Sequence, residues 1–135
     1  MFLITDAFKM IAEIRRTGWQ MNLWGGALNI PQAIGGLIFI QTMEGAVILF
    51  CAILTLMVAG QIHKRARFSR IIAICHLPWL VMLPWLIHRL LSTEHSIFLQ
   101  IWGWYVAVVV AVSLIFDALD LWRYAKGDRL YAWSD

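Results

Sequence analysis

The chain has 135 residues, of which 61% are hydrophobic and 14% are charged, and its formal net charge is +3. A soluble domain is about half apolar and about a quarter charged, so this composition excludes an ordinary soluble protein and predicts an all-α integral membrane protein. Three membrane-spanning helices with their loops would use nearly the whole length, which leaves no room for a soluble catalytic domain.

The N-terminal segment, residues 1–32, predicts an amphipathic helix and then an irregular connector. Between Leu3 and Arg16, apolar residues recur at three- and four-residue steps, and charged residues occupy the complementary positions. Such a helix can lie on the membrane surface, or it can pack against the bundle or a partner protein. From Thr17 to Pro31, glycines mixed with tryptophans indicate an irregular connector that is suited to re-entry into the bilayer.

Three apolar runs predict a transmembrane bundle over residues 33–125. Each run is long enough to cross the hydrocarbon core once, and the first is too short to cross it twice. The predicted spans are residues 33–62, 71–91 and 97–121. A short polar turn joins the second and third spans, which predicts an antiparallel hairpin, and residues 126–135 form a short tail.

Lysine and arginine predict the orientation, because cytoplasmic loops carry an excess of both. In a three-span chain, one side holds Lys9, Arg15, Arg16 and Arg89, and the other holds Lys64, Arg65, Arg67, Arg70, Arg123, Lys126 and Arg129. We therefore expect a cytoplasmic C-terminus, although an additional pass would change the parity. The basic residues follow the ends of the apolar runs, which indicates topology rather than binding of nucleic acid.

Glu44 is the most informative ionisable residue, because it lies about 12 Å inside the first predicted span. Gln41 lies one turn away on the same predicted face. A charge at such a depth costs roughly 3 kcal/mol against lipid, so it must face a partner or a water-filled cavity. The pair could form a proton or cation site, or Glu44 could form an interhelical hydrogen bond or ion pair with His88 or Arg89.

The second predicted span contains Pro78 and Pro84, which interrupt its hydrogen-bond ladder and predict a kinked or locally unwound helix. The freed carbonyl groups could coordinate an ion or a substrate, or the prolines could act only as kinks. His76 and His88 suggest haem ligation. They lie about 18 Å apart along one helix, so they cannot both bind one iron, and haem would require another helix or a second subunit.

Asp117 and Asp120 lie near the end of the third predicted span and can meet the basic loop. They could form salt bridges with Arg65, Arg67 or Arg70, or they could form the mouth of a cation or proton pathway. The two cysteines fall inside predicted spans, and their spacing predicts neither a disulfide nor a metal site. No catalytic motif is present, so the sequence predicts no enzyme and no cofactor.

Three short segments, Arg67–Arg70, His76–Trp79 and Asp117–Arg129, resemble small uncharacterised bacterial inner-membrane proteins. The resemblance covers the C-terminal half of the chain and implies a bacterial inner membrane, with no assigned activity.

Three functions follow as hypotheses. The first is a non-enzymatic accessory or scaffold subunit, whose partners are the lipid bilayer and either further copies of the chain or a larger membrane complex. The second is a small homo-oligomeric channel or transporter for a cation or proton. The third is a redox subunit that binds haem or quinone.

Overall fold

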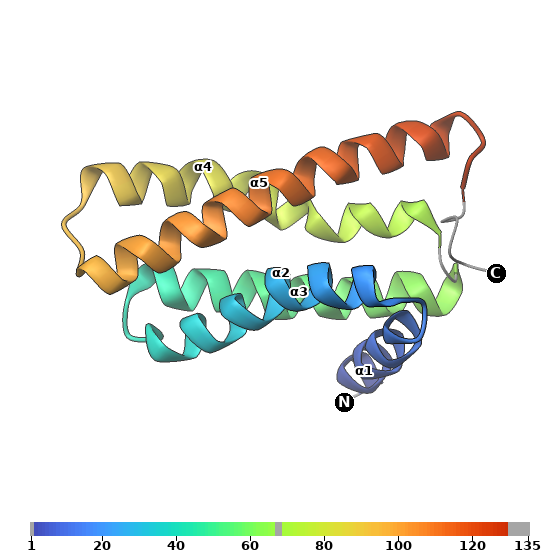
Figure 1. Ribbon diagram of the computed structural model, residues 1–135, viewed down its shortest axis with the longest axis horizontal. Coiled ribbons are helices and arrows are strands. Elements are labelled where there is room, and N and C mark those ends of the chain that lie inside the picture. Colours follow the sequence, from blue (N-terminus) through green and yellow to red (C-terminus); the bar gives the residue numbers. More distant parts are fainter. Residues whose placement is uncertain (1, 67–68, 130–135) are drawn as a thin grey trace.

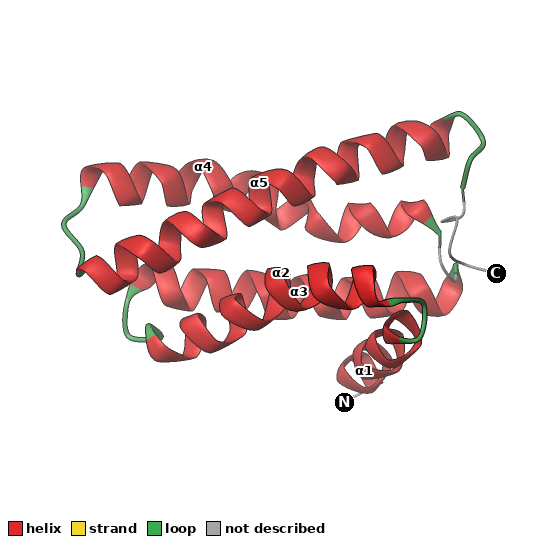
Figure 2. Ribbon diagram, in the orientation of Figure 1, coloured by secondary structure: helices red, strands yellow, loops and turns green. Residues whose placement is uncertain are grey.

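The computed structural model describes residues 2–66 and 69–129, and these two ranges contain helices and no strand. The helices are α1 (Phe2–Arg15), α2 (Trp19–Ile38), α3 (Met43–Arg65), the 3-10 helix η1 (Arg70–His76), α4 (Leu77–Ser92) and α5 (Ile97–Ala125). Figure 2 shows that short loops connect them. The prediction of an all-α fold is confirmed.

Three helical segments are long and apolar enough to cross a membrane, and they comprise α3, η1 with α4, and α5. Their outward faces carry large exposed apolar side chains such as Phe50, Val81 and Phe98, which suit contact with acyl chains. An amphipathic helix, α1, precedes them. The chain is therefore a multi-pass membrane protein with three apolar helical segments and an amphipathic N-terminal helix.

The predicted irregular connector is wrong, because α2 begins at Trp19 and continues through Pro31 to Ile38. This helix contains no charged residue. Its polar side chains satisfy themselves locally: Asn29 Nδ2 donates to the Gly25 carbonyl at 3.0 Å, and Gln32 Nε2 donates to the Leu28 carbonyl at 2.8 Å. Back-bonding of this kind lets a polar residue stay helical in an apolar environment.

The first predicted span, residues 33–62, is also wrong as a single helix. The chain leaves α2 after Ile38, turns through residues 39–42 and restarts as α3 at Met43. Thr42 caps the new helix, because its Oγ1 accepts a hydrogen bond from the Gly45 N–H at 3.0 Å. Gly45 is required there, since a Cβ at this position would overlap the Phe39 carbonyl group.

Figure 1 shows α2, α3, η1 with α4, and α5 lying side by side, with each helix antiparallel to the next in sequence. Contacts between α5 and α2 close this arrangement into a four-helix bundle. α1 lies crosswise against α3, on the half of the bundle toward the C-terminal end of α5. Gly60 permits that contact, because a Cβ there would lie 2.8 Å from the Ala7 backbone nitrogen.

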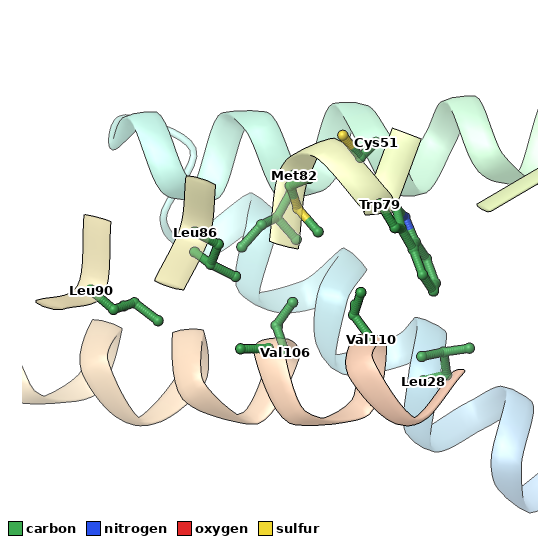
Figure 3. Close-up of a cluster of buried hydrophobic side chains, with 10 residues drawn as sticks. Leu28, Cys51, Trp79, Met82, Leu86, Leu90, Val106 and Val110 are labelled. Atoms are coloured by element: carbon green, nitrogen blue, oxygen red, sulfur yellow. The ribbon is translucent and has the colours of Figure 1, made fainter. Parts of the chain in front are cut away.

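The core runs along the bundle axis and takes residues from α2, α3, α4 and α5 (Figure 3). Its largest fully buried apolar side chains are Trp79, Ile48, Leu86, Val106 and Val110. A second, smaller cluster around Met10, Ala59 and Cys75 joins α1 to α3 and η1. Apolar packing therefore connects all the helices, and ionisable groups occupy the regions near their ends.

Candidate functional site

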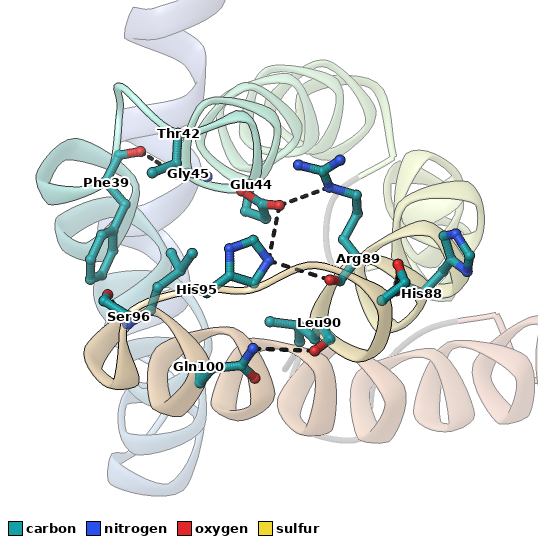
Figure 4. Close-up of polar contacts among 12 residues, drawn as sticks. Phe39, Thr42, Glu44, Gly45, His88, Arg89, Leu90, His95, Ser96 and Gln100 are labelled. Atoms are coloured by element: carbon teal, nitrogen blue, oxygen red, sulfur yellow. Dashed lines mark hydrogen bonds and ion pairs between the residues drawn. The ribbon is translucent and has the colours of Figure 1, made fainter.

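Glu44 lies in the first turn of α3, where it faces α4 and the loop before α5 (Figure 4). Its Oε1 lies 2.8 Å from Arg89 Nε and 3.3 Å from His95 Nε2. The Glu44 side chain is only 3% exposed, whereas that of Arg89 is 30% exposed. The ion pair with Arg89 is present, and the start of the α3 helix also favours a negative charge at this position.

His95 joins the same cluster, because its Nε2 also lies 3.3 Å from the Arg89 carbonyl oxygen. Both neighbours of this nitrogen are acceptors, so Nε2 carries a proton and donates it. His95 is a member of this cluster that the sequence did not identify. The position of His95 in a polar turn did not indicate a contact with Glu44, because only the folded loop brings the imidazole back over α3.

Two expectations about this cluster are wrong. Glu44 is not deep inside a helix, since the break before α3 places it at a helix end. Gln41 does not share its face, because it is an exposed residue of the preceding turn. Figure 4 shows His88 pointing away from Glu44, and its side chain is exposed on α4.

His76 and Asp117 form a second contact, nearer the other end of the bundle. His76 Nδ1 lies 2.6 Å from Asp117 Oδ2, which joins η1 to α5. The imidazole also stacks on Trp79, with 4.2 Å between the ring centroids and 16° between the planes. His76 therefore contacts a carboxylate and an aromatic ring at the junction between η1 and α4.

The two prolines of the second predicted span, Pro78 and Pro84, occupy different positions in α4. Pro78 lies in the first turn of α4, where the missing N–H is not needed. The Ile74 carbonyl before it is not free, because it accepts a 3-10 hydrogen bond from the Leu77 N–H. Pro84 lies inside α4. The expected local unwinding is present as the change from a 3-10 helix to an α-helix at Leu77.

Arg70 forms a third cluster with the C-terminal end of α5. Its Nη1 lies 2.7 Å from Asp120 Oδ1, and its Nη2 lies 3.4 Å from Asp128 Oδ2. The Arg70 side chain is 7% exposed. The predicted salt bridge to Asp120 is present, whereas Arg67 lies outside the described residues and Asp117 contacts His76 instead.

α1 is held by polar contacts that the sequence did not identify. Glu13 Oε2 lies 2.7 Å from His63 Nε2, and Asp6 Oδ2 accepts hydrogen bonds from Gln61 Nε2 at 2.9 Å and Lys64 Nζ at 3.2 Å. The hydrogen bonds from Gln61 and Lys64 lower the pKa of the Asp6 carboxyl below its ordinary value. At least 50 residues separate these partners in the chain, so no local pattern could reveal them.

These clusters join acids to bases across helices. Three histidines, His63, His76 and His95, each contact a carboxylate. The described residues hold no group of three or more His, Cys, Asp or Glu that could bind a metal ion. Cys51 and Cys75 are free and buried. The most direct effect of these acid–base contacts is to hold one helix against another.

No protein-family model matches the chain, and no curated protein or solved structure shows significant similarity to it.

Proposed function

We propose that the chain is a non-enzymatic membrane subunit that serves as an accessory or scaffold component of a larger assembly. The observation that carries this proposal is the pairing of the buried ionisable groups with one another. Glu44 is held by Arg89 and His95 at one end, and Arg70 is held by Asp120 near the other. Groups that already neutralise each other favour a structural role over a catalytic one.

The side chains between these two ends also support this proposal. The described residues buried there are uncharged, and they consist mainly of the apolar core around Ile48, Leu86 and Val106. An ion that crossed one protomer would meet no charged side chain at mid-depth. A conducting pathway would therefore have to form between protomers.

The test is native mass spectrometry of the protein after affinity isolation from its own membrane in mild detergent. A foreign subunit in fixed stoichiometry is the expected result. A homo-oligomer that conducts protons or cations in liposomes, with flux abolished by Glu44→Gln, would overturn the proposal. Glu94→Gln is the matched control, since Glu94 is an exposed residue of the loop before α5.

We also propose that α2 crosses the bilayer as a fourth helix, with both termini in the cytoplasm. α2 has 20 residues, which is about 30 Å and matches the hydrocarbon thickness. It packs along α3 and reverses the chain before Met43. A fourth crossing moves α1 to the same side as the C-terminal end of α5.

The charges support this orientation. Among the described residues, Arg89 is the basic residue at the end that holds Glu44, whereas the opposite end holds Lys9, Arg15, Arg16, Lys64, Arg65, Arg70, Arg123, Lys126 and Arg129. This asymmetry is stronger than in the three-span arrangement, and it favours a cytoplasmic location for the basic end. We also propose the bacterial inner membrane as the location, which the resemblance suggested for the C-terminal half implies.

Labelling of single cysteines with an impermeant maleimide in right-side-out vesicles tests this orientation. Cysteines at Ala12 and at Lys126 should both be protected, and a cysteine at Glu94 should be labelled. Protection at one terminus with labelling at the other would refute the fourth crossing.

A further inference from the structure

Three uncharged polar side chains are buried inside the bundle, and each has one polar atom that remains unpaired. The atoms are Gln32 Oε1, Thr55 Oγ1 and Trp79 Nε1, and none has a hydrogen-bond partner among the described residues. Gln32 and Trp79 are 0% exposed, and Thr55 is 3% exposed. A buried polar atom without a hydrogen-bond partner destabilises the folded state, so three of them together require an explanation.

The three residues come from different helices, namely α2, α3 and α4. The contact between Glu44 and Arg89 sets α3 and α4 at one level. From there, Thr55 lies eleven residues along α3 and Trp79 lies ten residues along α4, toward the same end. At 1.5 Å per residue, these distances are about 16 Å and about 15 Å, so both residues lie at nearly the same depth.

Gln32 reaches that depth as well. Gly36 of α2 lies against Leu49 of α3, since a Cβ at Gly36 would be 2.8 Å from Leu49 Cβ. From this contact, Gln32 lies about 6 Å along the bundle and Thr55 about 9 Å, in the same direction. Their levels therefore differ by about 3 Å, which is less than one helical turn.

The surrounding core supports this placement. Leu28 and Cys51, each one turn from Gln32 and Thr55 respectively, belong to the same buried cluster as Trp79. Figure 3 shows the Trp79 indole ring extending between Cys51 and Leu28. Gln32 Nε2 is already bonded to the Leu28 carbonyl, so its Oε1 is the atom that remains to be satisfied.

We infer that α2, α3 and α4 enclose a hydration site at the centre of the bundle, where ordered water connects Gln32 Oε1, Thr55 Oγ1 and Trp79 Nε1. The three groups suit water, because the indole N–H only donates, the amide oxygen only accepts, and the hydroxyl does both. A buried water typically makes about three hydrogen bonds to polar groups of this kind. The site joins three helices without any charged residue.

The first measurement is a nuclear Overhauser experiment between water and the tryptophan indole N–H protons, on the full chain in detergent micelles. Trp102 is the matched control, because its Nε1 donates to the Pro31 carbonyl at 2.9 Å. The Trp79 N–H should show a cross-peak to bound water, although its side chain is fully buried. Absence of that cross-peak would overturn the inference.

A double-mutant cycle then tests whether the groups share the water. Thr55→Val and Trp79→Phe should each lower the melting temperature, and the double variant should lose less than the sum, because the first change already removes the water. Thr55→Val with Trp102→Phe should be additive. If Thr55→Val and Trp79→Phe are each as stable as the parent, the site is dry. If the effects of these two changes are additive in the double variant, the two groups do not share a water. If a variant does not fold, the cross-peak decides alone.

Discussion

Partners on other helices stabilise the ionisable side chains inside this bundle. Glu44 is almost completely buried, yet it lies at a helix end where Arg89 can reach both the carboxylate and the membrane surface. His76 and His63 follow the same rule with Asp117 and Glu13. The chain avoids unpaired buried charges by placing acids and bases opposite each other near helix ends.

Removal of the Glu44 carboxylate tests this view. Glu44→Ala should lower the free energy of unfolding by about 3 kcal/mol, because it leaves Arg89 and His95 without their partner. Thermal unfolding in detergent measures the change. Glu94→Ala should have almost no effect, since that residue is exposed. Equal stability of the two variants would contradict a structural role for Glu44.

Asp6 gives a pH dependence to the docking of α1. The pKa of this carboxyl is lower in the folded state than its ordinary value of 3.8, so its contribution is present above pH 3.8 and is lost as the pH falls through the folded pKa. A spin label at Ala12 reports docking through its mobility. Asp6→Asn should be more mobile than the parent at pH 7, and the difference should vanish in acid. A difference that does not change with pH would refute the ionic contribution.

α2 shows how a helix tolerates a proline in its interior. Pro31 has no N–H, so the Ala27 carbonyl four residues earlier loses its helical donor. Tyr105 of α5 replaces it, since its hydroxyl donates to that carbonyl at 2.5 Å. Trp102 donates to the Pro31 carbonyl at 2.9 Å, so α5 supports α2 on both sides of the interruption.

Tyr105→Phe should therefore lower the free energy of unfolding by about 1 kcal/mol, because it leaves the Ala27 carbonyl unpaired. Tyr124→Phe is the control, since Tyr124 lies near the end of α5, where its ring contacts Arg129. Denaturant titration in detergent measures both variants. An equal effect of the two changes would show that the hydroxyl does not support α2.

Glycine decides how closely α1 approaches α3. Gly60→Ala should displace α1, because the new methyl group would lie 2.8 Å from the Ala7 backbone nitrogen, which cannot move independently of its helix. Maleimide labelling of a cysteine at the buried position Met10 should then increase. Gly26→Ala is the control, since the nearest atom to its Cβ would be Ile30 Cδ1 at an ordinary 3.7 Å. Unchanged labelling in Gly60→Ala would contradict this contact.

The bundle has one basic end and one end with little charge. Trypsin cleaves after lysine and arginine, so it should cut the chain readily from the basic side. We expect cleavage in inverted membrane vesicles and an intact chain in right-side-out vesicles. Among the described residues, Arg89 is the lysine or arginine at the other end, and it is paired with Glu44. Peptide mapping identifies the cut sites. Rapid cleavage in right-side-out vesicles would reverse the proposed orientation.

The amino-acid sequence alone predicted the class of fold and the second and third apolar spans. Those properties depend on composition and on the length of uncharged runs, which the solvent imposes on every helix alike. It also indicated the ion pairs between Glu44 and Arg89 and between Arg70 and Asp120, because hairpin topology places their helix ends together. These features require no knowledge of side-chain packing.

The remaining features are visible only in the folded chain. The break before Met43 depends on a local cap at Thr42 and on the close approach that Gly45 permits, and α2 stays helical because α5 supplies the hydrogen bond that Pro31 removes. The contacts of α1 with α3 involve residues far apart in the chain. The common depth of Gln32, Thr55 and Trp79 in the bundle does so as well. Such pairings depend on how the helices pack against one another, and the hydropathy of the sequence does not predict them.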